Sequence, residues 1–245
     1  MRINKYMNFI EGEILYFDKP LHWTSFTLVK KIRNELSRKL KVKKLKVGHA
    51  GTLDPLASGV MIVCTGKKTK LIETFQYQNK EYIATIRLGA TTPSFDLETE
   101  VDQTFQTSHI TRELVLDTLN KFIGEIEQIP PSFSACKVNG KRAYDLAREG
   151  KDVELKPKVL KIEDIELLSF APHEIEIRVV CSKGTYIRAL ARDIGEALDS
   201  GGHLTALRRT RIGEVHANNC MNPEDFATFI RNLDTAYLEE NVETN

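Results

Sequence analysis

The order of strand-like and helix-like segments restricts the fold of this chain more than any other feature. Alternating or continuous apolar runs, typical of β-strands, occur at residues 13–17, 60–64, 82–88, 157–170, 174–181 and 204–215. Apolar residues recur at helical spacing at residues 24–36, 69–75, 111–122 and 186–198, with short helices expected through Tyr144 and after Asn222. Residues 90–108 lack any periodicity and are predicted to be loop. Because strands and helices do not alternate strictly, the sequence predicts an α+β fold with a central, largely antiparallel mixed sheet flanked by helices.

The composition is that of an ordinary globular protein. With 245 residues, 41% hydrophobic and 28% charged, the chain can bury a sizeable core in one large or two small domains. No apolar run is long enough for a secretory signal or a membrane span, so a cytoplasmic location is expected. The four cysteines lack metal-ligand spacing and are predicted to be buried free thiols, and no metal site is expected: Cys64, Cys136, Cys181 and Cys220.

Charge is distributed unevenly along the chain, although the net charge is only +1. Residues 30–46 are rich in Lys and Arg and contain a single acid, Glu35, whereas the last residues are acidic. Such a basic run is often just a solvated helix face, and it can also meet a polyanion. Charge alone leaves both interpretations open.

Asp54 lies in the run Gly51-Thr52-Leu53-Asp54-Pro55-Leu56-Ala57-Ser58-Gly59. Pro55 disfavours helical backbone for the residue before it, so Asp54 is expected on an extended or turn backbone. By local chemistry alone, an Asp before Pro in a Gly-flanked loop is more often a turn former than a catalyst. A phosphate loop is excluded, because Gly59 and Gly66 enclose six residues where that motif requires four, and Lys68 replaces its Ser or Thr.

The longer string from Gly48 to Val60 resembles the catalytic segment of the bacterial tRNA pseudouridine-55 synthases, the TruB family. The resemblance covers roughly residues 13–213. Further matching segments follow in the expected order: Asp18-Lys19-Pro20, Tyr82 with Leu88-Gly89, Ile129-Pro130-Pro131 with Ser134-Ala135, Lys137 with Gly140-Lys141, Cys181-Ser182-Lys183-Gly184-Thr185-Tyr186-Ile187-Arg188, and Leu207-Arg208-Arg209.

This resemblance implies a pseudouridine synthase fold and the isomerisation of one uridine in the T loop of tRNA. The Asp that matches Asp54 acts in this family as nucleophile or base, and the sequence does not decide which atom it attacks. The target base must be flipped out of the folded tRNA into the pocket. The chemistry needs no cofactor, tRNA is the implied partner, and a monomer without an obligate protein partner is expected.

The resemblance also assigns roles around Asp54. His49 fills the space that the flipped base leaves, and Tyr82 stacks on that base. Arg188 pairs with the Asp54 carboxylate as a catalytic partner. Four further residues line or support the pocket: Tyr186 and Leu207 as walls, Asp96 as a second partner of Arg188, and Lys19 from its motif. Without the motif, His49 would be an ordinary loop or core residue, Tyr82 and Leu207 sheet core, and Arg188 a solvent-facing helix residue.

Residues 130–155 match the thumb-like insertion that clamps the T loop in this family, with Lys137, Lys141 and Arg142 as phosphate contacts. The catalytic domain is expected over residues 1–230, followed by a short acidic tail at 231–245. No C-terminal PUA-type RNA-binding domain is expected, since the chain ends too soon after Gly213.

Two departures from the family pattern stand near the site. His22 replaces a usual Gly, and Thr92-Pro93-Ser94 replaces a Thr-Asp-Thr run, which leaves Asp96 as the surviving acid. Two rival functions remain at this stage: a tRNA-binding and refolding module without turnover, and a sister pseudouridine synthase that acts on ribosomal RNA.

Overall fold

The computed structural model describes residues 7–134, 136–138, 141–148 and 155–233, and its chain divides into two compact units. The first unit comprises Met1–Gln78 and Arg208–Asn245, and the second comprises Asn79–Leu207. None of the described helices is long and apolar enough to cross a membrane.

The first unit is built around the strand β3 (Ala57–Thr65), which is buried along nearly its whole length. Its other strands are β1 (Ile14–Lys19), β2 (Val47–His49), β13 (Val215–His216) and residues 208–212 of β12 (Gly202–Ile212). Strands β1 and β2 both pair antiparallel with β3. Its helices are α1 (Ser25–Lys39), η1 (Gly66–Leu71), α2 (Ile72–Tyr77), η2 (Ala217–Asn219) and α6 (Pro223–Asn232).

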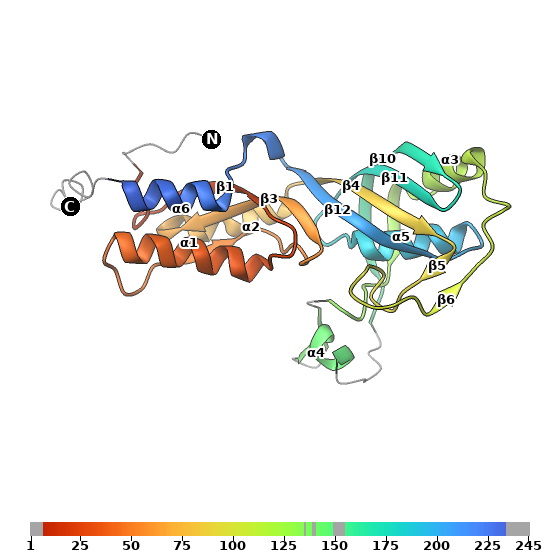
Figure 1. The fold of residues 1–245 in the computed structure, drawn as a ribbon, viewed down its shortest axis with the longest axis horizontal. Helices are drawn as coiled ribbons and strands as arrows, with labels where there is room; N and C mark the ends of the chain where they lie inside the picture. The colour runs from red at the N-terminus through yellow and green to blue at the C-terminus, as the bar shows by residue number, and fades with distance from the viewer. Residues whose placement is uncertain (1–6, 135, 139–140, 149–154, 234–245) are drawn as a thin grey trace. The chain divides into compact units, whose positions relative to one another are not determined.

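Helices cover both faces of this small sheet, which explains why β3 has apolar residues on both sides. On one face α1 and α6 lie side by side (Figure 1), and Phe17 of β1 packs edge-on against Phe226 of α6 with ring centroids 5.2 Å apart. On the other face Ile72 and Phe75, which both belong to α2, pack on a core cluster that includes Ile62. The burial of residues 60–64 confirms the buried strand that the sequence predicts.

The second unit contains a sheet in the order β12-β4-β11-β10-β7, using the first residues of β12. Its long strands are β4 (Lys80–Leu88), β7 (Gly124–Gln128), β10 (Lys158–Ala171) and β11 (Glu174–Cys181). The pairs β4–β11, β11–β10 and β10–β7 are all antiparallel, as predicted. Along β11 the residues Ile175, Ile177 and Val179 are buried in alternation, also as predicted.

Helices α3 (Arg112–Asn120) and α5 (Ile187–Ala197) pack against this sheet, α3 on β10 and α5 on β4. Thr111 caps α3 by accepting a hydrogen bond from the backbone of Leu114. The predicted hairpin near residue 139 is present as the antiparallel pair β8 (Lys137–Val138) and β9 (Lys141–Arg142), followed by α4 (Ala143–Arg148).

The structure corrects four expectations of local structure. The strand predicted over 204–215 ends at Ile212, because Gly213 turns the chain with φ +53° and β13 then folds back on β12. The region 90–108, expected to be loop, contains one short pair, β5 (Ala90–Thr91) with β6 (Gln103–Thr104).

The third correction concerns Phe26, one of the apolar residues at helical spacing that predict the helix over residues 24–36. Its side chain is 67% exposed, because it shares a helical face with Lys30 while Leu28 takes the buried position. Finally, all four cysteines are free, but only Cys64 and Cys181 are buried; the other two are half-buried.

Candidate active site

The loop that carries Asp54 is a β-turn in the first unit. The Ala57 N–H donates to the Asp54 carbonyl at 3.1 Å, so residues 54–57 form the turn that Pro55 predicts. The side chain of Asp54 is half-buried and has contacts within the protein. Asp54 is therefore partly exposed to solvent.

Ser25, the first residue of α1, ties this loop to the helix. Its hydroxyl donates to the Leu53 carbonyl at 2.9 Å and accepts from the Leu53 N–H at 2.8 Å. Both backbone groups of the residue before Asp54 are therefore satisfied by one buried side chain. The local sequence around Ser25 does not predict these two bonds.

His22 fixes the other side of the turn. Its N–H donates to the Pro55 carbonyl at 2.8 Å, and its φ of +65° lies in the left-handed region that glycine adopts freely. His22 thus holds the backbone conformation of the family's usual Gly, although a histidine is less suited to it. This departure leaves the turn intact.

Arg209 supports the loop from within the first unit and is only 1% exposed. Its guanidinium donates to the carbonyls of Val60 at 2.8 Å, Gly51 at 3.1 Å and Thr52 at 3.5 Å. The backbone of Gly59 packs so closely on that of Arg209 that a Cβ there would lie 2.1 Å from the Arg209 carbonyl oxygen. One buried cation therefore organises both ends of the Asp54 loop. Arg209 belongs to the motif Leu207-Arg208-Arg209, but the sequence does not predict that it holds the Asp54 loop.

Lys19 is a second buried cation of this unit. It is fully buried, and its ammonium donates to the carbonyls of Pro20 at 2.9 Å and Trp23 at 2.5 Å. Burial lowers the pKa of Lys19 to about 8, although the negative charge of Asp54 opposes the shift. Asp54 thus lies within electrostatic reach of an ammonium group that belongs to its own unit.

His49 ends β2, and its side chain is half-buried. Burial and the nearby charge of Arg209 lower the pKa of His49, so its ring is neutral at pH 7. The backbone of Gly51 acts against this lowering of the His49 pKa. The Nδ1 atom of His49 is buried and makes no hydrogen bond of normal geometry to a described residue. A neutral ring suits the predicted role of filling a space between stacked bases.

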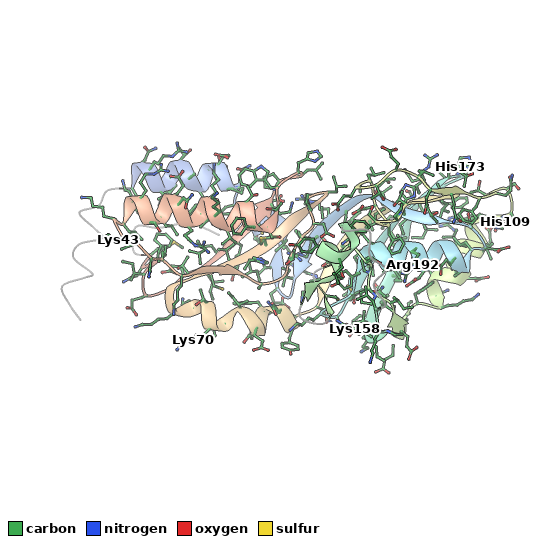
Figure 2. All side chains as sticks on the ribbon, turned by 90° about the horizontal axis from the view of Figure 1, so that it is seen from below. Lys43, Lys70, His109, Lys158, His173 and Arg192 are labelled. Carbon is green, nitrogen blue, oxygen red and sulfur yellow. The ribbon has the colours of Figure 1, made fainter. Side chains whose placement is uncertain are left out.

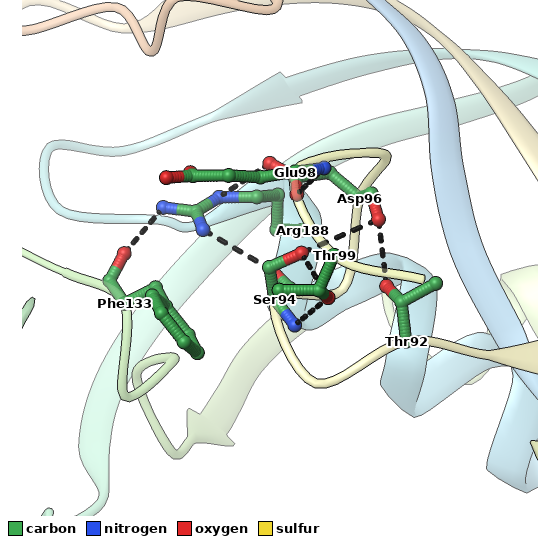
Figure 3. A network of polar contacts seen from close by, with 7 residues as sticks. All are labelled: Thr92, Ser94, Asp96, Glu98, Thr99, Phe133 and Arg188. Carbon is green, nitrogen blue, oxygen red and sulfur yellow. Dashed lines mark hydrogen bonds and ion pairs between the residues drawn. The ribbon is translucent and has the colours of Figure 1, made fainter. Parts of the chain in front are cut away.

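Arg188 is the centre of a buried polar network in the second unit (Figure 3). Its guanidinium donates to the carbonyls of Ser94 at 3.1 Å and Phe133 at 2.8 Å. The carboxylate of Asp96 lies 3.7 Å from its Nε, which confirms the expected contact between these two residues. Arg188 is therefore buried rather than solvent-facing. Its pairing with Asp54 stays a prediction, because the two residues belong to different units.

Tyr186, the residue before α5, is held by Gln128. The Gln128 side chain accepts from the Tyr186 N–H at 2.9 Å and donates to the Tyr186 carbonyl at 3.2 Å. The phenol lies 3.3 Å from the thiol of Cys136. Burial, reinforced by this thiol, raises the pKa of Tyr186, so the phenol stays protonated. Sequence analysis missed Gln128, since a polar residue ending a strand carries no local signal for such a bond.

Tyr82 lies on the buried face of β4, where it alternates with Ala84 and Ile86. Leu207 is half-buried on β12. Both positions suit sheet residues that can also line a pocket, and their contacts with a flipped base stay predictions. Lys137, Lys141 and Arg142 have a described backbone, but their side chains lie outside the described part of the structure.

Among the described residues, no group of His, Cys, Asp or Glu side chains could hold a metal ion.

Two family models match the chain in succession. "TruB family pseudouridylate synthase (N terminal domain)" matches residues 37–187, and "tRNA pseudouridylate synthase B C-terminal domain" matches residues 188–243. A tRNA pseudouridine synthase B of Phocaeicola vulgatus is 69% identical over 234 residues, which cover 96% of this chain and 98% of that one. One of Bacteroides fragilis is 69% identical over 228 residues, covering 93% and 98%.

Among solved structures, the chain is similar to one from "Crystal Structure of a Cbf5-Nop10-Gar1 Complex", with a TM-score of 0.68 and 27% identity. That match covers 98% of this chain and 60% of the solved chain, so the present chain spans less than two thirds of it. The fold is that of the pseudouridine synthases, an α+β class in which helices flank a mixed sheet. Within that class, the chain belongs to the TruB family.

Proposed function

We propose that this protein isomerises uridine 55 in the T loop of tRNA to pseudouridine, with Asp54 as the reactive carboxylate. The observation that carries the proposal is the Asp54 turn, whose backbone is held by Ser25 and Arg209. The chain that contains this turn is 69% identical to named tRNA pseudouridine synthases. Fixed geometry matters because a reacting group displaced by even about 1 Å can lose on the order of 10²-fold in rate.

The reaction exchanges one bond for another within the nucleotide. The bond from ribose C1′ to ring N1 breaks, the base turns, and a bond from C1′ to C5 forms. A proton leaves C5 and a proton is gained at N1, so no electron is gained or lost. Asp54 acts as nucleophile or base in this exchange, and its charge interacts with that of Lys19 in the same unit.

The remaining residues are assigned by the family pattern. Arg188 is the proposed catalytic partner of Asp54, and Asp96 holds Arg188. Tyr82 stacks on the flipped base, Tyr186 and Leu207 line its pocket, and His49 fills the vacated space as a neutral ring.

The hairpin and α4 suit the thumb-like insertion, with Lys137, Lys141 and Arg142 as proposed phosphate contacts. Binding through phosphates should weaken as the salt concentration rises. We further propose that residues 1–230 act as one catalytic domain, that the protein works as a monomer on tRNA without a cofactor or protein partner, and that it acts in the cytoplasm.

The decisive experiment compares the purified protein with its Asp54→Asn variant on an unmodified tRNA transcript. Pseudouridine is mapped by position, and tRNA affinity is measured separately. We expect the wild type to modify position 55, and the variant to lose turnover while keeping its affinity, because the substitution removes only the charge. Asp117→Asn, an exposed acid on α3, is the matched control and should leave turnover unchanged.

Each rival function predicts a different result. A binding module without turnover gives no pseudouridine with either protein. An enzyme for ribosomal RNA gives product in a ribosomal transcript and none in the T loop. Appreciable turnover by Asp54→Asn would refute the assignment of Asp54.

A further inference from the structure

Phe95 has a backbone conformation that its side chain does not favour. Its φ is +62°, in the left-handed region, where a bulky residue is a true outlier. Such a conformation persists only where surrounding contacts hold it, and it often marks a segment with a functional role. The backbone is held on both sides: the Phe95 N–H donates to the Thr92 carbonyl at 3.0 Å, and its carbonyl accepts from Leu204 N–H at 3.0 Å.

Arg192 of α5, labelled in Figure 2, is the side chain that holds the Phe95 ring. Its guanidinium carbon lies 4.8 Å from the ring centroid, within the range of a cation–π interaction. The same guanidinium donates to the Ile129 carbonyl at 3.1 Å. It also forms an ion pair with Asp193 at 2.6 Å, which fixes its orientation. Arg192 therefore joins the loop around Phe95 to the segment that leads into the thumb-like insertion.

Both of these segments contact Arg188. The residues on either side of Phe95 are Ser94, whose carbonyl accepts from Arg188, and Asp96, whose carboxylate pairs with it. The segment after Ile129 supplies the Phe133 carbonyl, which also accepts a hydrogen bond from Arg188. Arg188 and Arg192 are four residues apart on α5 and so share one face of the helix.

We infer that Arg192 is a positioning residue, which fixes the guanidinium of Arg188 by holding Phe95 and the segment 129–133 in place. The inference rests on the proposed function, because it assigns Arg192 to the site through Arg188. The plain alternative is a surface arginine that only neutralises Asp193 and Glu196, and in that case its loss would leave turnover unchanged.

The test measures kcat and KM for pseudouridine formation on a tRNA transcript. We expect Arg192→Ala to lower kcat about tenfold with KM nearly unchanged, because the misplaced group acts on the chemical step and not on tRNA binding. Phe95→Leu, which keeps apolar bulk but removes the ring, should have a similar effect. The double variant should be no worse than Arg192→Ala alone, since that variant already lacks the cation–π contact with Phe95. Phe95→Tyr keeps the ring and should retain wild-type turnover.

Arg178→Ala is the matched control for loss of an arginine in the same unit. Arg178 pairs with Glu81, Asp164 and Glu166, outside the proposed site, so its loss should leave kcat unchanged. The inference is overturned if Arg192→Ala keeps wild-type kcat. The inference is also overturned if Arg192→Ala has wild-type kcat at all temperatures below its melting transition. A loss of kcat seen only near that transition would reflect unfolding, a purely structural effect. A wild type that makes no pseudouridine in tRNA would instead refute the proposed function, and with it the basis of this inference.

Discussion

The loop that carries Asp54 and the loop 94–96, which contacts Arg188, are held in different ways. The Asp54 loop is fixed through its backbone, because Arg209 and Ser25 together bond the peptide groups of Gly51, Thr52, Leu53 and Val60. The loop 94–96, which contacts Arg188 of α5, is joined to that helix mainly through side chains, with Asp96 facing the guanidinium of Arg188 and Arg192 lying over Phe95.

This difference suggests how the two loops respond to substitution. Buried peptide groups without partners cost stability, so the Asp54 loop should be coupled to folding. The loop 94–96 has exposed neighbours such as Leu97 and Val101, and the Arg188 guanidinium retains carbonyl partners when one contact is removed. Its substitutions should affect turnover more than stability.

The largest expected effect is that of Arg209→Met. The substitution removes the guanidinium donor from three carbonyls of the Asp54 loop, and a carbonyl left buried without another partner, such as that of the buried Val60, costs roughly 1–3 kcal/mol. We expect the free energy of unfolding to fall by about 3 kcal/mol or more and turnover to be lost. Urea unfolding and product mapping measure both effects.

Arg208→Met is the neighbouring control. Arg208 is partly exposed and pairs with Asp18, so its loss should cost about 1 kcal/mol or less. Equal stability of the two variants would contradict the backbone role given to Arg209.

An intermediate effect is expected from the pH dependence of Lys19. In the folded protein its pKa is about 8, against 10.5 when exposed, so the unfolded chain binds more protons between these values. Stability should therefore rise with pH in this window as the buried ammonium loses its proton, and below pH 8 the full cost of burying the charge applies.

Because other groups titrate in the same range, the comparison is with Lys19→Met, which lacks the titration. The stability of the wild type relative to the variant should increase by on the order of 2 kcal/mol from pH 7.5 to 10. Urea unfolding at both pH values measures it. If the difference in stability between the wild type and Lys19→Met does not change with pH, burial does not lower the pKa of Lys19 in the folded protein.

The smallest effect on stability is expected from Asp96→Asn. Arg188 keeps its bonds to the Ser94 and Phe133 carbonyls, so we expect a loss of about 1 kcal/mol, together with a clear fall in kcat. Glu100→Gln, an exposed acid nearby, is the control for removing one negative charge. A loss of stability as large as that of Arg209→Met would remove the distinction between the two loops.

Local sequence patterns predicted much of the fold, because they report local physics. The alternation in β11, the helical stripe of α5 and the effect of Pro55 on the residue before it each depend on neighbours in the chain. The same reasoning failed where burial depends on distant elements. Phe26 has an apolar side chain at helical spacing, yet it faces solvent because α1 packs through Leu28 and Ile32.

For the site, the sequence by itself determined the family, through the order of its motifs, and with it the assignment of Asp54. Only the tertiary structure decided how the site is held. The bonds from Ser25 to Leu53 and from Arg209 to Gly51 join residues far apart in the chain, and no local pattern encodes them. A side chain's donors find their acceptors only after packing has excluded water, so these contacts follow from the folded core and not from spacing along the chain.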